Sequence, residues 1–216
     1  MRNQLLAQNR FIPNDKAVII ENPIDLNHIL RKAEASIDES LTDSEFICSA
    51  GRLIPEKGFS ILIHAFEKIA QQHENLKLLI LGEGKERKNL NTLIKDTGLQ
   101  DRVILMGHVD NPIPYYKKAK LCVVSSIKEG FPNVLLEMMA VNDSVVSTLC
   151  AGGIEKIPSI LKVEPNNINS LTSAIGFALA DYPSQKNDSR QDYLKDRSPE
   201  LFISSILEEV HRVNSL

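Results

Sequence analysis

From residue 46 to residue 163, short apolar runs alternate with longer segments in which apolar residues recur at helical spacing. The apolar runs read as buried strands, at 46–50, 76–81, 103–106, 121–125, 145–148 and 160–163. The segment after Gly58 is an example of the predicted helices between strands, because Phe59, Leu62 and Phe66 fall on one helical face. Strands joined through helices pair in parallel, so we predict an α/β fold with a Rossmann-like, doubly wound parallel sheet covered on both faces.

This pattern divides the chain into three parts, which we expect at residues 1–45, 46–182 and 183–216. The first part reads as an N-terminal segment and linker. It is predicted to begin with a short helical piece, to continue with a strand in the apolar run at 17–20, and to hold a helical stretch around 30–35.

Two helices and a polar stretch are expected toward the C-terminus. Helical spacing indicates helices over 168–180 and 199–213, and the polar stretch at 183–196 is expected to be mobile. With 216 residues, of which 43% are hydrophobic, the chain can bury one good core, and the alternating region is where that core is predicted.

Charge and hydropathy exclude several classes of protein. A formal net charge of -3 gives no basic surface of the kind that binds nucleic acid. No apolar run reaches the roughly 18 residues of a membrane span, and the first residues lack the apolar core of a secretion signal. We therefore expect a cytoplasmic protein without a nucleic-acid partner.

Cysteines and histidines do not indicate a metal or redox site. Cys48, Cys122 and Cys150 are odd in number and far apart, so they are predicted to be buried reduced thiols, with a catalytic cysteine as the weaker alternative. No two histidines stand at the helical spacing of metal ligands. Neither a metal nor a cofactor is predicted.

Two cations flank the loop that follows the first predicted strand. Arg52 and Lys57 precede a helix N-terminus, where free backbone N–H groups already favour an anion, so together they would hold a diphosphate. The alternative is that Arg52 pairs with Glu56 and that Lys57 is a solvated residue of the first helical turn.

A glycine-rich turn follows the second predicted strand. Gly82 and Gly84 match part of the dinucleotide-binding fingerprint, but Arg87 stands where its third glycine belongs. The turn either lets the backbone approach a ligand or serves only the turn itself, and both interpretations stay open.

Two carboxylates, eight positions apart, bracket the junction between the fourth strand and its helix. Glu129 lies in the loop and Glu137 about one turn into the helix. Such a pair suits the acid and base of a hydrolase, or it suits two grips on the ends of an elongated ligand with hydroxyl groups. Each glutamate also has a plain interpretation as a solvated residue.

Several motifs in order resemble one family. These are Gly51-Arg52 with Lys57-Gly58, the Gly82-x-Gly84 turn, the run from Glu129 to Glu137 with Met138-Met139-Ala140, and the later Gly152-Gly153-Ile154-Glu155. Together they resemble the C-terminal, donor-binding domain of retaining GT-B glycosyltransferases, the glycosyl transferases group 1 (GT4-like), over about residues 17–160. Asn142 and Ser144 depart from the Gly and Pro common there, although Asn tolerates a left-handed turn.

The resemblance implies roles for individual residues. Arg52 and Lys57 would neutralise the diphosphate of a nucleotide-sugar, Glu129 would hold donor-sugar hydroxyls, and Glu137 would bind the ribose. These three, Arg52, Lys57 and Glu129, are the expected catalytic residues. The remaining expected donor-binding residues are Gly51, Gly82, Gly84, His108 and Val109 near the base, Gly130, Phe131, Pro132, Asn133, Val134 and Leu135.

The resemblance also implies an activity and partners. A hexosyl unit would pass from a nucleotide-sugar, with UDP as the first choice, to a glycan or lipid-linked acceptor with retention. The donor part alone resembles one lobe of such an enzyme, so residues 1–45 would link to an N-terminal lobe or a partner chain that binds acceptor. A lipid-linked acceptor would bring peripheral membrane association at the inner face. The alternatives are an inactive nucleotide-sugar-binding or truncated interaction module and, third, a hydrolase.

Overall fold

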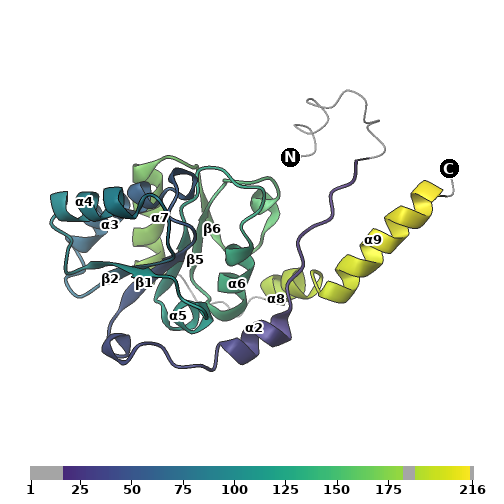
Figure 1. Ribbon diagram of the computed structural model, residues 1–216, viewed down its shortest axis with the longest axis horizontal. Helices are drawn as coiled ribbons and strands as arrows, with labels where there is room; N and C mark the ends of the chain where they lie inside the picture. Colours follow the sequence, from purple (N-terminus) through teal and green to yellow (C-terminus); the bar gives the residue numbers. More distant parts are fainter. Residues whose placement is uncertain (1–16, 182–187, 215–216) are drawn as a thin grey trace.

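The computed structural model describes residues 17–181 and 188–214, which form a six-stranded parallel sheet with helices on both faces (Figure 1). The spatial order of the strands is β3-β2-β1-β4-β5-β6. Their bounds are β1 Phe46–Ala50, β2 Lys77–Leu81, β3 Val103–Gly107, β4 Leu121–Val124, β5 Val145–Thr148 and β6 Leu161–Val163. The predicted α/β, doubly wound architecture is confirmed, and the order reverses between β1 and β4.

Successive side chains along each strand point to opposite faces of the sheet and so contribute to two separate hydrophobic cores. In β1, Phe46 and Cys48 face one core while Ile47 faces the other, and β2 and β4 alternate in the same way. The first core is closed by α2 Leu26–Lys32, α5 Ile113–Lys118, α6 Asn133–Val141 and α8 Asp188–Lys195, and the second by α3 Phe59–Ala70, α4 Arg87–Asp96 and α7 Ile168–Asp181. Burial on both faces explains why the strands are continuous apolar runs.

Backbone segments of the first two strand-end loops pack directly against each other. The backbone N–H of Leu53 donates to the carbonyl of Glu83 at 2.8 Å. A Cβ on Gly82 would lie 2.0 Å from the carbonyl oxygen of Gly51, and one on Gly84 would lie 2.4 Å from that of Leu53. The glycine-rich turn therefore leaves room for the neighbouring loop of the same chain.

The N-terminal segment differs from its prediction. Residues 17–25 contain no strand, and the apolar side chains of Val18 and Ile19 are exposed, because no strand of the sheet lies beside this segment. Helix α2 begins at Leu26, earlier than expected, since the Asp25 carboxylate accepts a hydrogen bond from the His28 backbone N–H at 2.8 Å. The short helical piece predicted near the N-terminus lies outside the described residues.

Part of the polar stretch expected to be mobile is helical. Helix α8 packs against α6: Leu194 is buried, and the Arg190 guanidinium donates to the carbonyl of Asn142 at 2.9 Å and pairs with Asp143. Residues 182–187, within the same stretch, lie outside the described residues. Buried Leu194 and the contacts of Arg190 therefore hold residues 188–195 against α6. The sequence pattern does not reveal these contacts.

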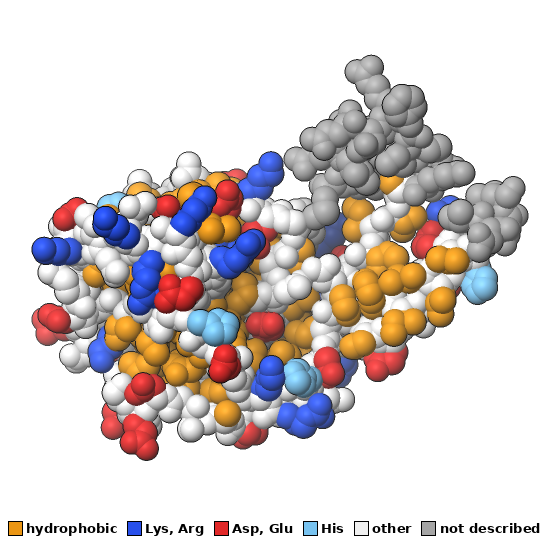
Figure 2. Space-filling view, in the orientation of Figure 1, with side chains coloured by type: hydrophobic (Ala, Val, Ile, Leu, Met, Phe, Trp, Pro, Cys, Tyr) orange, Lys and Arg blue, Asp and Glu red, His pale blue; other side chains and the backbone are white. Residues whose placement is uncertain are grey.

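The segment before α2 and the segment after α8 are joined by direct contacts. The Ile24 N–H donates to the carbonyl of Arg197 at 2.8 Å, and the Arg197 guanidinium pairs with Glu21 and lies 3.4 Å from the ring centroid of Tyr193. From there α9, Pro199–Asn214, extends away from the sheet domain (Figure 1). Hydrophobic side chains are exposed along this helix (Figure 2), and its exposed large hydrophobic residues are Leu201, Ile203, Ile206, Leu207 and Val210. None of the helices described here is long and apolar enough to span a bilayer.

Three glycine-to-alanine variants distinguish two reasons for glycine in this fold: a positive φ angle and a close approach of another backbone segment. Gly82→Ala adds both a left-handed strain and the 2.0 Å clash, Gly98→Ala adds only the strain because nothing lies within 4 Å, and Gly152→Ala adds neither. We expect losses in unfolding free energy of at least about 3, about 1 and about 0 kcal/mol, respectively. Chemical denaturation measures them, and equal losses for Gly82→Ala and Gly98→Ala would rule out the backbone clash.

Candidate active site

A cavity of about 450 Å³ opens at the carboxyl ends of the strands, where the strand order reverses. Such a switch point is the usual ligand site of an open parallel sheet. The loops after β1, β2, β3 and β4 reach it, together with the first turns of α6. Its lining residues are Ala50, Gly51, Arg52, Lys57, Leu81, Gly82, Glu83, His108, Val109, Pro112, Tyr116, Glu129, Pro132, Asn133, Val134 and Glu137.

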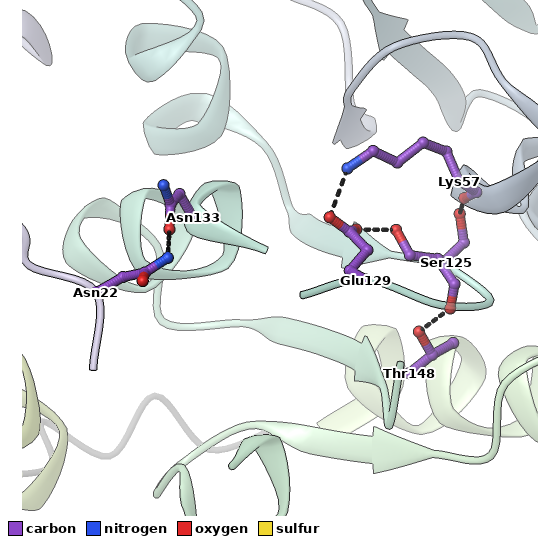
Figure 3. A network of polar contacts seen from close by, with 7 residues as sticks. Asn22, Lys57, Ser125, Glu129, Asn133 and Thr148 are labelled. Atoms are coloured by element: carbon purple, nitrogen blue, oxygen red, sulfur yellow. Dashed lines mark hydrogen bonds and ion pairs between the residues drawn. The ribbon is translucent and has the colours of Figure 1, made fainter. Parts of the chain in front are cut away.

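An ion pair joins two of the predicted catalytic residues across this cavity (Figure 3). The Lys57 ammonium lies 2.8 Å from one oxygen of Glu129, and the side chains are only 16% and 14% exposed. The Ser126 hydroxyl donates a hydrogen bond to the other oxygen of the same carboxylate. The alternative of a solvated Lys57 is therefore wrong.

Hydrogen bonds between the two loops hold this pair in place. The Ser125 hydroxyl donates to the carbonyl of Lys57 at 2.9 Å, and the Thr148 hydroxyl donates to the carbonyl of Ser126 at 2.5 Å (Figure 3). Gly58 allows the close approach, because a Cβ there would lie 2.2 Å from the Ser125 carbonyl oxygen. The loop after β1 and the loop after β4 thus form one unit.

Arg52 supplies an exposed cation to the same cavity. Among the described residues it has no ion-pair partner, so the predicted alternative of a pair with Glu56 is not found there. Its guanidinium is available to an anionic ligand, whereas the charge of Lys57 is already shared with Glu129.

Helix α6 presents its N-terminus and one carboxylate to the cavity. The N-cap residue is Pro132, and no side chain caps this end, so first-turn N–H groups remain for an anion. The Asn133 side chain accepts a hydrogen bond from Asn22 at 2.5 Å (Figure 3). Burial raises the pKa of Glu137, and the positive charge of Lys32 on α2 opposes that shift in part.

Four of the expected binding residues do not line the cavity. Gly84 packs against Leu53, Phe131 packs against the core, Leu135 is fully buried and Gly130 lies outside the lining. The run after Glu129 was predicted to line the cavity continuously, but Gly130 and Phe131 lie in the loop before α6, and within α6 the helical period of 3.6 residues turns Leu135 into the core while Asn133, Val134 and Glu137 line the cavity.

Several lining residues were not predicted from the sequence. Pro112, the N-cap residue of α5, and Tyr116, within α5, both line the cavity, and their spacing of four residues was the available signal that they share one side of the helix. Glu83 also lines it and pairs with Arg87 at 2.7 Å. His108 also lines the cavity, where its side chain is 78% exposed and lies 3.2 Å from the carboxylate of Asp110.

In the described part of the chain, the cysteines do not indicate a nucleophilic thiol, and the acidic residues do not indicate a metal site. Cys48, Cys122 and Cys150 are buried, and burial raises the pKa of each thiol, which disfavours the nucleophilic thiolate. No cluster of three His, Cys, Asp or Glu among these residues is placed to bind a metal ion. The prediction of buried reduced thiols is confirmed.

Comparison with known proteins gives a consistent result. Residues 31–195 match the sequence profile described as Glycosyl transferases group 1. The chain is 36% identical over 180 residues to the N-acetylgalactosamine-N,N'-diacetylbacillosaminyl-diphospho-undecaprenol 4-alpha-N-acetylgalactosaminyltransferase of Campylobacter jejuni, covering 82% of this chain and 48% of that protein. It is 29% identical to the lipopolysaccharide core biosynthesis glycosyltransferase LpsE of Rhizobium meliloti, covering 88% of this chain and 54% of LpsE.

Solved structures share the fold. A glycosyltransferase from Rickettsia africae superposes with a TM-score of 0.78 at 24% identity, covering 95% of this chain and 59% of that one. TarM of S. aureus gives a TM-score of 0.78 at 20% identity, covering 96% and 41% of the two chains. The chain spans about half the length of the two curated relatives named above, since the matches cover 48% and 54% of those proteins.

The raised pKa of Glu137 predicts that burial of its carboxylate lowers the stability of the folded state in a pH-dependent way. The folded state binds a proton more readily than the unfolded state, so stability falls as pH rises from the ordinary carboxyl value through the higher folded value. Glu137→Gln should therefore melt at a higher temperature than the wild type at pH 7 and at nearly the same temperature near pH 4. Scanning calorimetry across this range measures the difference.

Glu129→Gln is the matched control, and its effect should have the opposite sign. Loss of the carboxylate leaves the ammonium of Lys57 without its partner, which should cost about 1 to 2 kcal/mol at pH 7. A Glu137→Gln variant that is less stable than the wild type at pH 7 would contradict our assignment of Glu137 as a costly buried acid.

Proposed function

Because the chain belongs to the glycosyl transferases group 1 family, we propose that the cavity binds a nucleotide-sugar and that residues 46–182 are its donor-binding domain. The observation that carries the proposal is the convergence of two cations with Glu129 and Glu137, two of the three carboxylates that line the cavity, at the switch point. Arg52 and Lys57 come from one loop, whereas Glu129 and Glu137 come from the loop and helix after β4.

The cations and the N-terminus of α6 are suited to the diphosphate. In the proposed complex Arg52 and Lys57, with first-turn N–H groups at Asn133 and Val134, surround the phosphate oxygens. The same charges stabilise the nucleoside diphosphate as it leaves the sugar. In this role they need no metal.

The carboxylates are suited to the hydroxyl groups at the two ends of the donor. Glu137 would accept hydrogen bonds from the ribose, close to His108 and Val109 at the base, and Glu129 would accept them from the sugar. Glu129 is already bonded by Lys57 and Ser126, which favours a fixed acceptor over a hydrolytic acid.

The proposed reaction moves a hexosyl unit, with retention, to a glycan or lipid-linked acceptor. The C. jejuni relative is by name a transferase acting on a diphospho-undecaprenol-linked saccharide, so we place UDP-N-acetylgalactosamine first among the donors. A lipid-linked acceptor implies peripheral association with the inner face of the membrane.

We further propose that transfer requires a second, acceptor-binding lobe. Closure by such a lobe would exclude water and position the acceptor hydroxyl. Residues 1–45 are the proposed linker to it, and the apolar side chains of α9 in Figure 2 provide a surface on which it would pack. A chain that binds donor without transferring it remains the alternative.

Calorimetric titration with UDP-, GDP- and ADP-sugars tests the donor site. We expect one nucleotide class to bind, and we expect Glu137→Ala and Arg52→Ala each to weaken it about tenfold or more, because each removes a charged hydrogen-bonding partner. Glu67→Ala and Arg212→Ala, which change side chains outside the cavity lining, should leave affinity unchanged. Unaltered affinity in both cavity variants would refute the site.

A transfer assay tests the need for a second lobe. With a lipid-linked saccharide acceptor, the chain alone should release little UDP from a bound UDP-sugar, and adding the N-terminal half of the C. jejuni relative in trans should raise the rate at least tenfold. The alternative of a binding module predicts no increase, and Arg52→Ala should abolish any increase that occurs.

A further inference from the structure

Ser126 is a buried polar residue, only 2% exposed, two residues beyond the end of β4. Its hydroxyl donates to Oε1 of Glu129, while the Lys57 ammonium lies 2.8 Å from Oε2 of the same carboxylate. Both oxygens of Glu129 are thus fixed from inside the protein. A carboxylate offers about four acceptor positions, so about two remain for a ligand.

The position of Ser126 is itself fixed by the sheet. The Thr148 hydroxyl, at the end of β5, donates to the Ser126 carbonyl at 2.5 Å. The Glu129 N–H donates to the carbonyl of Cys150 at 2.9 Å, which anchors the other end of the loop. Among the described residues, the Ser126 hydroxyl is thus the donor that connects this fixed backbone to Oε1 of Glu129, the oxygen that Lys57 does not contact.

We propose that Ser126 is a positioning residue that orients the Glu129 carboxylate for two neighbouring hydroxyl groups of the donor sugar. The proposal rests on the proposed function of Glu129 as the sugar acceptor. An acceptor held by two donors keeps its direction in the absence of ligand, so binding need not order it. Without the Ser126 hydroxyl, Glu129 turns with the flexible side chain of Lys57.

If Ser126 orients Glu129, removal of its hydroxyl should weaken binding of the sugar part of the donor and leave binding of the nucleotide part unchanged. Ser126→Ala should reduce affinity for UDP-N-acetylgalactosamine about tenfold and leave affinity for UDP unchanged, because UDP has no group at Glu129. Ser49→Ala is the matched control: this serine is equally buried, and its hydroxyl donates to the carbonyl of Val123 at 2.6 Å, away from Glu129. It should leave the ratio of the two affinities unchanged.

A second measurement needs no ligand. Reductive methylation with ¹³C-formaldehyde, followed by NMR, reports how accessible the Lys57 ammonium is. We expect faster labelling of Lys57 in Ser126→Ala than in the wild type, as the carboxylate partner loses its orientation, and Glu129→Gln gives the rate for the broken pair. Ser126→Cys keeps the size of the side chain with a weaker donor, so it should also label faster and covers a folding failure of Ser126→Ala.

The outcomes separate this proposal from the proposed function. An unchanged labelling rate of Lys57 in both Ser126 variants overturns the positioning role. An equal loss of affinity for UDP and UDP-N-acetylgalactosamine also overturns it, since that indicates a general structural defect. Faster labelling, in a protein whose wild type binds no nucleotide-sugar of the panel, supports the positioning role and rejects the proposed function.

Discussion

The ion pair between Lys57 and Glu129 joins the two loops that follow the neighbouring strands β1 and β4. Lys57 belongs to the loop after β1 and Glu129 to the loop after β4, and the strand order reverses between these two strands. At a reversal the crossover helices diverge to opposite faces, so contacts between the loops must bridge the gap above it, and the Ile127 N–H adds one by donating to the carbonyl of Glu56 at 2.7 Å. The pair, with the hydrogen bonds of Ser125 and Ser126, turns this gap into a cavity with fixed walls.

The sheet could be predicted from the sequence because strands buried on both faces must be apolar throughout. Every predicted strand from residue 46 onward exists, within one or two residues at its ends. The run at 17–20 failed the same test, because an apolar run indicates a strand only if a neighbour is free to pair with it. Helix α8 was missed because its anchor Arg190 appears polar in sequence and is buried in the fold.

At the site, residue types could be predicted and their partners could not. The motifs identified Arg52, Lys57, Glu129 and Glu137 as cavity residues, but not which carboxylate Lys57 would meet, since that depends on contacts between distant loops. Asn142 is a second example. It is extended, with φ of -134°, and not left-handed, and its side-chain amide donates to the carbonyls of Tyr116 and Ala119 at 2.7 Å.

The hydrogen bond between Ile24 and Arg197 has a mechanical consequence. Segments from near the two ends of the described chain pass side by side at this point, reinforced by the ion pair between Arg197 and Glu21 (Figure 1). Any body attached through both segments is held by two adjacent tethers. It can swing about the line that joins them but cannot twist freely, as it would on a single tether, so its approach to the cavity is confined to one hinge axis.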